Sequence, residues 1–417
     1  MKICFIADAR SPIAKNWITY FVQRGHDVHV ISSYPCSGNN YPNASVQEVT
    51  SKLSRRAGIQ SNEGGRGATQ GLSSRLTAEA RTGRLSDVTF AIQHWVERFG
   101  VGRRSDAIRE LCRQIKPDVV HAMRLPFEGI TAALADPPAP LLISIWGNDL
   151  TLFARRFPVT GRQSCRALQR ADALHCDCNR DLKLAAQFGF DTHKPSIVLP
   201  GGGGIQMDVF GTREADSTVR RRFEIPENVP LVCNPRGFRG YVRNDTFFRS
   251  VALTTKCRPD VVFAAVGMQG HPVAERWISS LGIEQNVRLL PMLSRAEMAM
   301  LLQASDIVVS PSEHDGTPNT LLESMAAGAF PIVGNIESVR EWINDGVNGS
   351  LRDPSDAQGF SEAILSAVAD RQLRISAAVR NRQLIADRAE YSSSMEKAER
   401  FYERLLCKSG INLASGY

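Results

Sequence analysis

The chain has 417 residues, a length that exceeds one ordinary core and favours two domains of similar size. Hydrophobic residues make up 43% and charged residues 22%, as in a globular enzyme rather than a disordered or membrane-spanning chain. The 50 basic and 43 acidic side chains give a net charge of +7, which suits an anionic substrate or an anionic membrane surface. No basic stripe interleaved with aromatic residues is present, so we expect no nucleic-acid partner.

The chain begins with an apolar run at residues 3–7, which Asp8 and Arg10 interrupt. This run is too short for a signal peptide and predicts a first strand. Nine cysteines, scattered from Cys4 to Cys407, form no disulfide framework and fit a reducing compartment. We therefore expect a cytoplasmic protein, with peripheral contact at the inner membrane face left as an option.

Strand-like runs alternate with helical patterns through the first half of the chain. Strands are expected at residues 2–7, 27–32, 118–121, 141–145, 173–177 and 196–199. This alternation predicts a doubly wound α/β domain with a parallel sheet. Residues 51–86 interrupt it, because their glycines and basic side chains indicate a flexible basic insertion. An apolar helical stripe follows at residues 87–100, which either packs on its own domain or faces a membrane or an acceptor.

The second half repeats the pattern after a hinge and linker at residues 201–204 and 212–222. Strands are expected at residues 231–234, 261–266, 287–290, 307–310 and 331–333, and Ser294 with Glu297 predicts a capping box for a helix at 295–303. We place the first domain at 1–210, the second at 211–393, and at 394–417 a C-terminal helix that packs back on the first domain.

Residues 307–333 read as strand, loop, helix and strand, the repeating unit of a parallel sheet. Thr317 is the expected N-cap of the helix and Pro318 its first residue, since proline has no N–H to leave unpaired there. The helix N-terminus then offers free amides to a phosphate. These amides belong to Asn319, Thr320 and Leu321.

Two carboxylates flank that phosphate-binding site. Glu323, in the helix, can accept hydrogen bonds from two neighbouring ribose hydroxyls, and Asp315, in the loop before Gly316, can reach the group that the diphosphate carries. The order of carboxylate, helix N-terminus and carboxylate therefore predicts a nucleotide-sugar site.

The segment from Asp315 to Glu323 resembles the motif Glu-Gly-x-Pro/Gly-x-x-x-Leu-Glu of the retaining, nucleotide-sugar-dependent glycosyltransferases of family four, the group 1 type. The resemblance implies an α/β protein with the GT-B fold: two Rossmann-like, doubly wound parallel-sheet domains facing across a cleft. It implies that Glu323 binds the ribose and that Asp315 contacts the donor sugar. It also implies retention of configuration in transfer to a carbohydrate, lipid-linked or small-molecule acceptor.

The segment NPRGFRGYVRND resembles the family's strand followed by an arginine and a lysine that grip the donor diphosphate. Arg236 matches the arginine, and Arg239 or Arg243 replaces the lysine. Two guanidiniums and a helix N-terminus can neutralise the leaving group without a metal, and no Asp-x-Asp pair occurs, so we expect no metal and no cofactor. We expect the base, uridine or guanosine, to be read largely by backbone and shape around residues 288–293, with Arg288 as a donor-binding candidate.

The first domain departs further from the family pattern. The family's His-x-His becomes His121 followed by Met123, so His121 is a catalytic candidate whose role is left open between catalysis and structure. Four further residues are candidates for the acceptor side of the cleft. They are Ser11, Lys15, Arg124 and Asp149.

Alternative functions remain open at this point. One is a nucleotide-sugar 2-epimerase on the same fold, and another is a catalytically inactive binding or scaffold protein, which the departures at Asp315 and Met123 allow. A dinucleotide dehydrogenase is disfavoured because no G-x-G-x-x-G follows a predicted strand. The nearest approach to a metal pattern is His175, Cys176 and Cys178 with His193, for which we favour strand-end packing.

Overall fold

The computed structural model describes residues 1–36, 41–50, 100–211 and 217–408. The predicted basic insertion, residues 51–86, and residues 87–99 of the apolar stripe lie outside the described residues. The chain divides into two compact units, one formed by Met1–Gly203 with Ser393–Tyr417 and the other by Gly204–Ser392.

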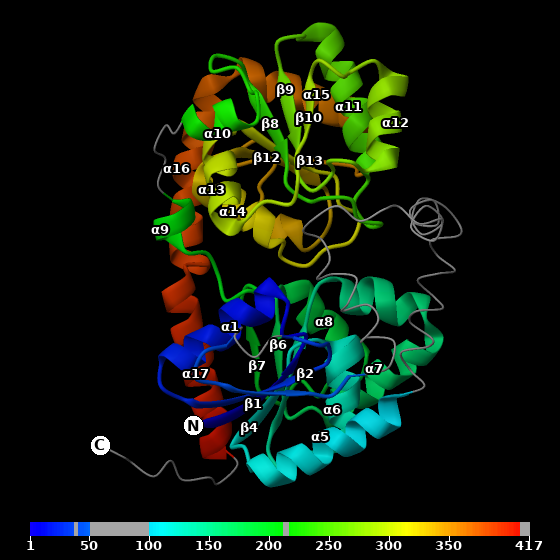
Figure 1. The fold of residues 1–417 in the computed structure, drawn as a ribbon, viewed down its shortest axis with the longest axis vertical. Coiled ribbons are helices and arrows are strands. Elements are labelled where there is room, and N and C mark those ends of the chain that lie inside the picture. Colours follow the sequence, from blue (N-terminus) through cyan, green and yellow to red (C-terminus); the bar gives the residue numbers. More distant parts are fainter. Residues whose placement is uncertain (37–40, 51–99, 212–216, 409–417) are drawn as a thin grey trace. The chain divides into compact units, whose positions relative to one another are not determined.

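In the described part of the first unit, seven parallel strands lie in the order β3-β2-β1-β4-β5-β6-β7 (Figure 1). Their sequences are short and fully or largely apolar in the centre of the sheet, as expected of strands covered on both faces. The strands are β1 (Lys2–Ala7), β2 (Asp27–Ser32), β3 (Ser45–Glu48), β4 (Val119–Ala122), β5 (Leu141–Ile145), β6 (Ala173–Cys176) and β7 (Ser196–Val198).

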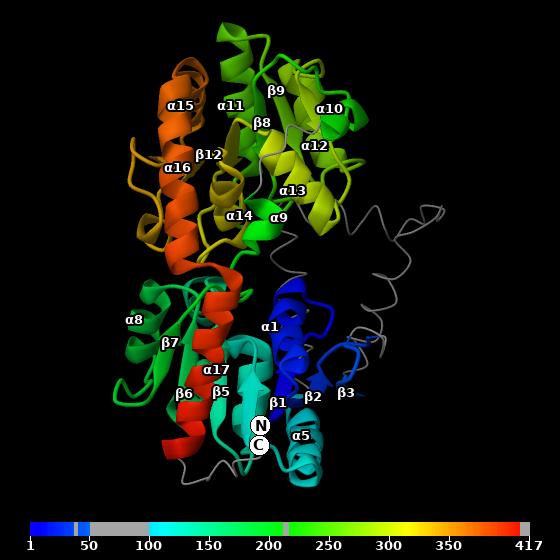
Figure 2. The same cartoon turned by 90° about the vertical axis from the view of Figure 1, so that its left-hand side faces the viewer.

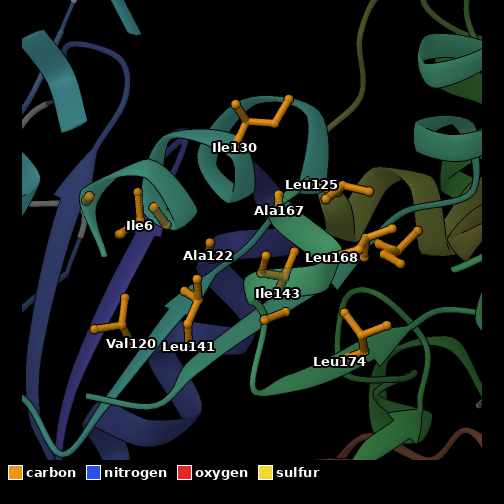
Figure 3. Packing of buried hydrophobic residues seen from close by; sticks show 14 of the residues in the cluster. Ile6, Val120, Ala122, Leu125, Ile130, Leu141, Ile143, Ala167, Leu168 and Leu174 are labelled. Carbon is orange, nitrogen blue, oxygen red and sulfur yellow. The ribbon is translucent and has the colours of Figure 1, made fainter. Parts of the chain in front are cut away.

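Helices cover both faces of this sheet. The helical elements of the first unit are α1 (Pro12–Gln23), α5 (Val101–Ile115), the π-helix η3 (Leu125–Gly129), α6 (Ile130–Ala135), the π-helix η4 (Asp149–Ala154), α7 (Pro158–Arg170), α8 (Asn179–Gln187) and α17 (Tyr391–Lys408). Side chains from α5, α6, α7 and α8 pack on one face of β1, β4, β5 and β6 and form a continuous apolar core. Figure 3 shows part of this core, with Val120 and Ile143 on the strands, Ile130 and Leu168 on the helices, and Ile143 beside Leu168.

The other face of the first sheet carries α1 together with α17, which comes from the end of the chain (Figure 2). The aromatic rings of Phe21 and Tyr402 lie 4.8 Å apart between their centroids, and Phe5 of β1 packs against both. Glu399 of α17 accepts a hydrogen bond of 2.9 Å from the hydroxyl of Tyr20. The last helix therefore belongs to the core of the first unit.

In the described part of the second unit, six parallel strands lie in the order β10-β9-β8-β11-β12-β13. They are β8 (Leu231–Asn234), β9 (Val262–Ala265), β10 (Val287–Leu289), β11 (Ile307–Ser310), β12 (Phe330–Gly334) and β13 (Ser350–Arg352). The helices are α9 (Met207–Phe210), α10 (Ser217–Arg222), α11 (Asn244–Cys257), α12 (Pro272–Leu281), α13 (Arg295–Ala304), α14 (Asn319–Ala327), the 3₁₀-helix η5 (Val339–Glu341), α15 (Ala357–Ala369) and α16 (Arg371–Arg388). The helices α9, α13, α14 and α16 bury one face of the sheet, and α11, α12 and α15 bury the other.

The segments that enter and leave the second unit lie side by side within it. Ile205 N–H donates to Ala389 O at 2.7 Å, and Tyr391 N–H donates to Ile205 O at 3.0 Å. Gly204 has φ +107°, and a Cβ there would lie 2.5 Å from Ala389 O, so only glycine fits. This close pairing explains why the glycine run marks the change of unit.

The predicted fold class is confirmed: two Rossmann-like units, each with a parallel sheet between layers of helices. The first unit ends at Gly203 rather than at residue 210, because Phe210 of α9 is buried in the core of the second unit. The capping box of Ser294 and Glu297 is present at α13. Among the described residues, no helix combines the length and the apolarity that crossing a membrane requires.

Candidate functional site

The order of strands in the second sheet reverses direction between its neighbours β8 and β11. From β8 the chain continues outwards to β9, and from β11 it continues the other way to β12. In open parallel sheets, ligands bind beyond the carboxyl ends of the strands at such a switch point, where the two loops diverge. The loop after β8 carries Arg236, and the loop after β11 carries Asp315.

Arg236 joins these two loops and the helix that follows them. Its side chain is buried, and Nη2 lies 2.5 Å from Oδ2 of Asp315 while Nη1 donates to Oγ1 of Thr320 at 3.1 Å. The remaining donor, Nε, is buried and has no acceptor among the described residues. A buried donor left in this state costs free energy unless a ligand supplies an acceptor.

Asn234, the last residue of β8, was missed by the sequence interpretation. It is fully buried, its Oδ1 accepts the N–H of Arg236 at 3.1 Å, and its Nδ2 has no acceptor among the described residues. The sequence contained a signal for it, because a polar amide side chain at the carboxyl end of a buried apolar strand is unusual and indicates a binding or structural role. Nδ2 of Asn234 and Nε of Arg236 thus form a pair of buried donors at the switch point.

The loop that carries Asp315 is braced from η5 and the residues beside it. Oγ of Ser338 donates to the carbonyl of Asp315 at 2.8 Å, and Nε1 of Trp342 donates to Oγ1 of Thr317 at 3.0 Å. Gly316 N–H donates to Oδ1 of Asp315 at 3.2 Å. These bonds hold the Asp315 carboxylate on the side of Arg236.

The start of α14 differs from the prediction in one residue. Pro318 is the N-cap, with φ −69° and ψ 121°, and the helix begins at Asn319. The predicted cap Thr317 instead uses its hydroxyl for Trp342, and Leu321 N–H already donates to Pro318 O at 3.0 Å. The Leu321 amide is therefore not offered to a ligand, whereas the amides of Asn319 and Thr320 are the first-turn donors that a phosphate can use.

Glu323 lies further along α14 in a partly buried position. Burial raises the pKa of its carboxyl, and the positive charges of Arg295 and Arg236 lower it. Arg295, at the start of α13, is a second residue that the sequence interpretation missed. The two positive charges favour the ionised carboxylate of Glu323, which is the form that accepts hydrogen bonds from vicinal hydroxyls.

The two arginines predicted to replace the family's lysine differ in their surroundings. Arg239 is exposed and donates to the hydroxyl of Tyr241 at 2.8 Å. Hydrogen bonds to Asp245 and Glu313 raise the pKa of Arg243 and hold its guanidinium on the surface. Arg239, unlike Arg243, forms no ion pair with a carboxylate of the described residues.

Arg288 does not lie at the switch point. It is on the edge strand β10, and it donates to the carbonyls of Gln285 at 2.9 Å and Glu224 at 3.2 Å. Both carbonyls precede a strand, at the amino ends of the sheet, so the structure separates Arg288 from the site to which we had assigned it.

In the first unit, the predicted residues Arg124 and Asp149 form an ion pair. They follow the neighbouring strands β4 and β5, and Nε of Arg124 lies 3.1 Å from Oδ1 of the fully buried Asp149. Burial raises the pKa of Asp149 to about 6, against the lowering effect of Arg124. The guanidinium also lies over the rings of Phe127 and Trp146, at 5.2 Å and 5.4 Å from their centroids.

His121 is fully buried and has partners at both ring nitrogens. Nε2 lies 2.7 Å from Oγ of Ser144, and Nδ1 lies 2.5 Å from the hydroxyl of Tyr402. Burial and the neighbouring His175 lower the pKa of His121 well below its ordinary value. Of the two roles left open, the structure places His121 in the structural one, because no ligand can reach an imidazole enclosed in this way.

The other two candidates lie after β1. Ser11 is the N-cap residue of α1, and its side chain makes no capping hydrogen bond. Lys15 lies one turn into the same helix and is exposed. Both side chains therefore remain candidates for acceptor binding at the carboxyl edge of the first sheet.

One group among the described residues brings potential metal ligands together. Donor atoms of the buried residues Asp177, Cys178 and Asp181 lie within 4.8 Å of one another. Arg180 already supplies positive charge, since its Nη2 lies 2.7 Å from Oδ1 of Asp181. His175, the ligand that the sequence offered, engages both ring nitrogens in hydrogen bonds. We assign no metal to this group.

Two family descriptions match separate parts of the chain. Residues 216–383 match the family "Glycosyl transferases group 1", and residues 2–61 match "Glycosyl transferase 4-like". The first match covers the whole switch-point site of the second unit, from Asn234 to Glu323.

Curated relatives align with part of the chain. A D-inositol 3-phosphate glycosyltransferase of Corynebacterium urealyticum is 26% identical over 48% of this chain and 50% of its own length. The lipopolysaccharide core biosynthesis glycosyltransferase LpsE of Rhizobium meliloti is 28% identical over 42% of this chain and 50% of its own length. The aligned part of the chain thus spans about half the length of the curated relatives that it matches.

Solved structures share the fold over nearly the whole chain. Alr3699/HepE of Anabaena in complex with UDP aligns with a TM-score of 0.71 and 17% identity, over 97% of this chain and 100% of that one. Sucrose-phosphate synthase of Thermosynechococcus elongatus aligns with a TM-score of 0.74 and 12% identity, over 98% and 100%. The two family matches identify the chain as a glycosyltransferase of the group 1 type, and the solved structures show that its two Rossmann-like units have the GT-B fold.

Proposed function

We propose that the protein transfers a sugar from a nucleoside diphosphate sugar to an acceptor hydroxyl with retention of configuration, in the synthesis of a glycan, polysaccharide or glycolipid. The observation that carries this proposal is the pair of buried donors at the switch point, Nε of Arg236 and Nδ2 of Asn234. A diphosphate is rich in acceptor oxygens, and the amides of Asn319 and Thr320 stand at the start of the neighbouring helix.

In this proposal, each part of the donor meets one group of the second unit. The diphosphate oxygens accept hydrogen bonds from Arg236, Asn234 and the α14 amides, which stabilise the charge that grows on the leaving group. Glu323 accepts from the ribose hydroxyls. Asp315, which faces Arg236 in this structure, turns its carboxylate to the sugar when the diphosphate takes its place on the guanidinium.

The bond changes balance without an added cofactor. The acceptor oxygen forms a bond to the anomeric carbon, the bond from that carbon to the diphosphate breaks, and the acceptor proton leaves with a phosphate oxygen. Retention and this internal proton transfer rest on the family resemblance. Metal independence rests on the missing Asp-x-Asp pair and on the positive charge of Arg236 and Arg239.

The comparisons support a nucleotide-sugar donor and favour sugar transfer over the alternative functions. The Anabaena relative was solved with UDP and with UDP-glucose, and the bacterial relatives carry glycosyltransferase names. A 2-epimerase would release an isomerised sugar without an acceptor, and a scaffold protein would bind the donor without turnover. Product analysis with one donor therefore separates all three.

Arg236→Ala tests the proposed diphosphate site. The change should lower kcat/KM for the donor about tenfold to a hundredfold, because a charge-assisted hydrogen bond is worth about 1.5–3 kcal/mol. Arg239→Ala should act in the same direction but less, since its guanidinium is exposed. The matched control is Arg258→Ala, which removes a surface ion pair with Asp260 in the same unit. Equal kinetics in Arg236→Ala and the control would place the diphosphate elsewhere.

Turnover in the presence of a strong chelator tests metal independence. We expect the transfer rate to stay within about twofold of the untreated protein, because guanidinium and amide donors supply the charge stabilisation. Complete loss of activity with chelator, restored by magnesium or manganese, would show that the leaving group needs a divalent ion.

We also propose a cytoplasmic location, with peripheral contact at an anionic membrane. The nine cysteines are all free, and the net charge of +7 supports attraction to anionic lipids. Deletion of residues 58–84, in the basic part of the sequence, should weaken binding to phosphatidylserine vesicles while hydrolysis of a soluble donor continues. Equal vesicle binding by the deleted and the intact protein would remove the membrane from the proposal.

A further inference from the structure

Trp342 follows directly after η5 and is buried in the second unit. Its side chain belongs to the apolar core that α9, α13, α14 and α16 form on one face of the sheet. The guanidinium carbon of Arg388, the last residue of α16, lies 4.3 Å from the centre of the indole ring. A cation over an aromatic face attracts the ring, so this contact helps to hold the indole in place against α16.

The backbone of Trp342 is connected to the same helix. Nδ2 of Asn348 donates to the carbonyl of Trp342 at 3.0 Å and to Oδ1 of Asn381, on α16, at 2.8 Å. Nδ2 of Asn381 donates in return to the carbonyl of Asn348 at 2.8 Å. Both amide side chains are buried, so water competes little with these bonds. The ring and the backbone of Trp342 are therefore both positioned by α16.

The indole N–H of Trp342 binds the threonine that precedes α14. Nε1 donates to Oγ1 of Thr317 at 3.0 Å, and both residues are buried. An indole N–H can only donate, and a buried one usually finds an acceptor. Here the acceptor is a side-chain hydroxyl in the loop of the donor site. The bond therefore fixes the direction in which the hydroxyl oxygen of Thr317 points.

Without this bond, the hydroxyl of Thr317 would suit the first turn of α14. A threonine oxygen commonly accepts hydrogen bonds from the amides two and three residues later, which here belong to Asn319 and Thr320. Among the described residues, neither amide donates to Thr317, whose oxygen accepts from Trp342 instead, and Pro318 stands at the N-cap. The two amides that the proposed diphosphate site needs are therefore the two that a capping hydroxyl would occupy.

We propose that Trp342 is a positioning residue of the donor site, which holds the hydroxyl of Thr317 away from α14 and so leaves the first-turn amides open to the diphosphate. This inference rests on the proposed function, because it assigns Trp342 a task in the same site. A helix start without a side-chain cap is less stable by itself, and a bound diphosphate supplies the acceptors that it lacks. Trp342 itself contacts no ligand in this assignment and acts through Thr317.

The test is calorimetric titration of the full chain with UDP and with GDP, combined with substitutions at the two residues. Trp342→Phe keeps an aromatic ring beside Arg388 and removes the N–H, so the hydroxyl of Thr317 can turn to α14. The Kd of the nucleotide should then rise about threefold to thirtyfold, which is the affinity equivalent of a threonine cap.

A second substitution at Thr317 separates this competition from a general weakening of the fold. Thr317→Val removes the hydroxyl and keeps the branched shape, so in the Trp342→Phe background it should restore the Kd to within about twofold of the unmodified protein. Thr317→Ser in the same background is the matched control, because serine caps a helix as well as threonine does and should leave the Kd raised. A core that Trp342→Phe had merely loosened would not recover through a further substitution.

Several results would overturn this inference. They are no binding of either nucleotide by the unmodified protein, an unchanged Kd in Trp342→Phe, a raised Kd that Thr317→Val leaves raised, and equal restoration by Thr317→Ser. Failure of the proposed function has a different signature, namely the expected pattern of Kd values without turnover of any nucleoside diphosphate sugar. The two failures are distinguishable because the titration measures binding of the bare nucleotide and requires no sugar transfer.

Discussion

Asp315 and Glu323 belong to one loop and helix, yet their side chains meet different partners. Asp315 forms an ion pair with Arg236, in which Oδ2 of Asp315 and Nη2 of Arg236 are 2.5 Å apart. Glu323 is partly buried in α14, where Arg236 and Arg295 lower the pKa of its carboxyl against the effect of burial. Removing each charge should therefore change a different step.

Glu323→Gln should weaken nucleoside diphosphate binding about tenfold or more, because the nitrogen end of an amide cannot accept a ribose hydroxyl. Asp315→Asn should leave that affinity unchanged or tighter, since the variant frees Arg236 from a competing anion, while turnover of the intact sugar donor falls at least tenfold. Calorimetric titration of the nucleoside diphosphate and rate measurements with the full donor give both quantities.

Glu362→Gln, at an exposed position of α15, serves as the control for the loss of one negative charge. If Asp315→Asn loses the bare nucleotide while Glu323→Gln retains it, the two roles are assigned to the wrong residues.

At the scale of elements, a buried hydrogen-bond chain ties α1, α17 and three strands of the first sheet together. The chain consists of Trp17, Tyr402, His121, Ser144, His175 and the carbonyl of Leu199. The indole N–H can only donate and the carbonyl can only accept, so both ends fix the direction of every bond between them. With both histidines neutral, each member has a donor or acceptor in the required position.

Tyr402→Phe should lower the free energy of unfolding of the first unit by about 1–3 kcal/mol. The change leaves the buried N–H of Trp17 without an acceptor and His121 without its donor. Chemical denaturation followed by tryptophan fluorescence measures the effect. Tyr241→Phe, in the second unit, is the comparison. An equal loss of unfolding free energy in both variants would mean that the buried hydrogen-bond chain adds no stability beyond that of an ordinary tyrosine hydroxyl.

The same buried hydrogen-bond chain makes the free energy of unfolding of the first unit depend on pH. Burial lowers the pKa of His175 from 6.5 to about 4, so between these values the unfolded imidazole is protonated and the folded one is not. The unfolded state then binds more protons, and stability falls as the pH drops from about 6.5 towards 4, by up to about 1.4 kcal/mol for each pH unit.

Denaturation at pH 7.5, 6 and 5 should show this loss, and His175→Gln should reduce its slope. His193→Gln, at an exposed position, is the matched control. A slope that stays the same in His175→Gln would assign the pH dependence to other groups.

At the scale of the whole molecule, the last helix of the chain completes the unit that the first strand begins. Phe401, Tyr402, Leu405 and Leu406 of α17 are buried, and the residues from Ser393 onwards group with the first unit although the second unit precedes them in the chain. Stability of the N-terminal sheet should therefore depend on residues near the C-terminus.

Phe401→Ala should destabilise only the first unit, by about 3–5 kcal/mol, because it removes a large buried side chain. Hydrogen exchange measured by mass spectrometry should speed up in peptides of β1 and β4 and stay unchanged in β8 and β11. Glu403→Ala, exposed on the same helix, is the control. Faster exchange in both sheets would mean that the units unfold together.

Most elements were predictable because their signals are local. Central strands such as β1, β2, β5 and β11 have the predicted bounds, since a run of apolar residues between turn residues is visible without any partner. The edge strands β3 and β13 were missed. β3 is largely exposed and β13 has only three residues, so the pairing of each depends on the neighbouring strand rather than on an apolar run of its own.

The candidate site was predictable where its residues follow one another in the sequence. The segment from Asp315 to Glu323 indicated a carboxylate, a helix N-terminus and a second carboxylate by itself, and the family resemblance added Arg236. The sequence alone therefore determined the fold class, the helix N-terminus that we propose as the phosphate site, and the expectation of glycosyl transfer.

Only the tertiary structure decided which distant side chains satisfy one another. It paired Arg236 with Asp315 and enclosed His121 under a tyrosine from the far end of the chain. Within the described part of the chain, it also left buried donors of Arg236 and Asn234 without acceptors and one carboxyl oxygen of Glu128 without a donor. Burial and hydrogen-bond satisfaction depend on what the folded chain brings next to a group, and residue type alone carries no record of those neighbours.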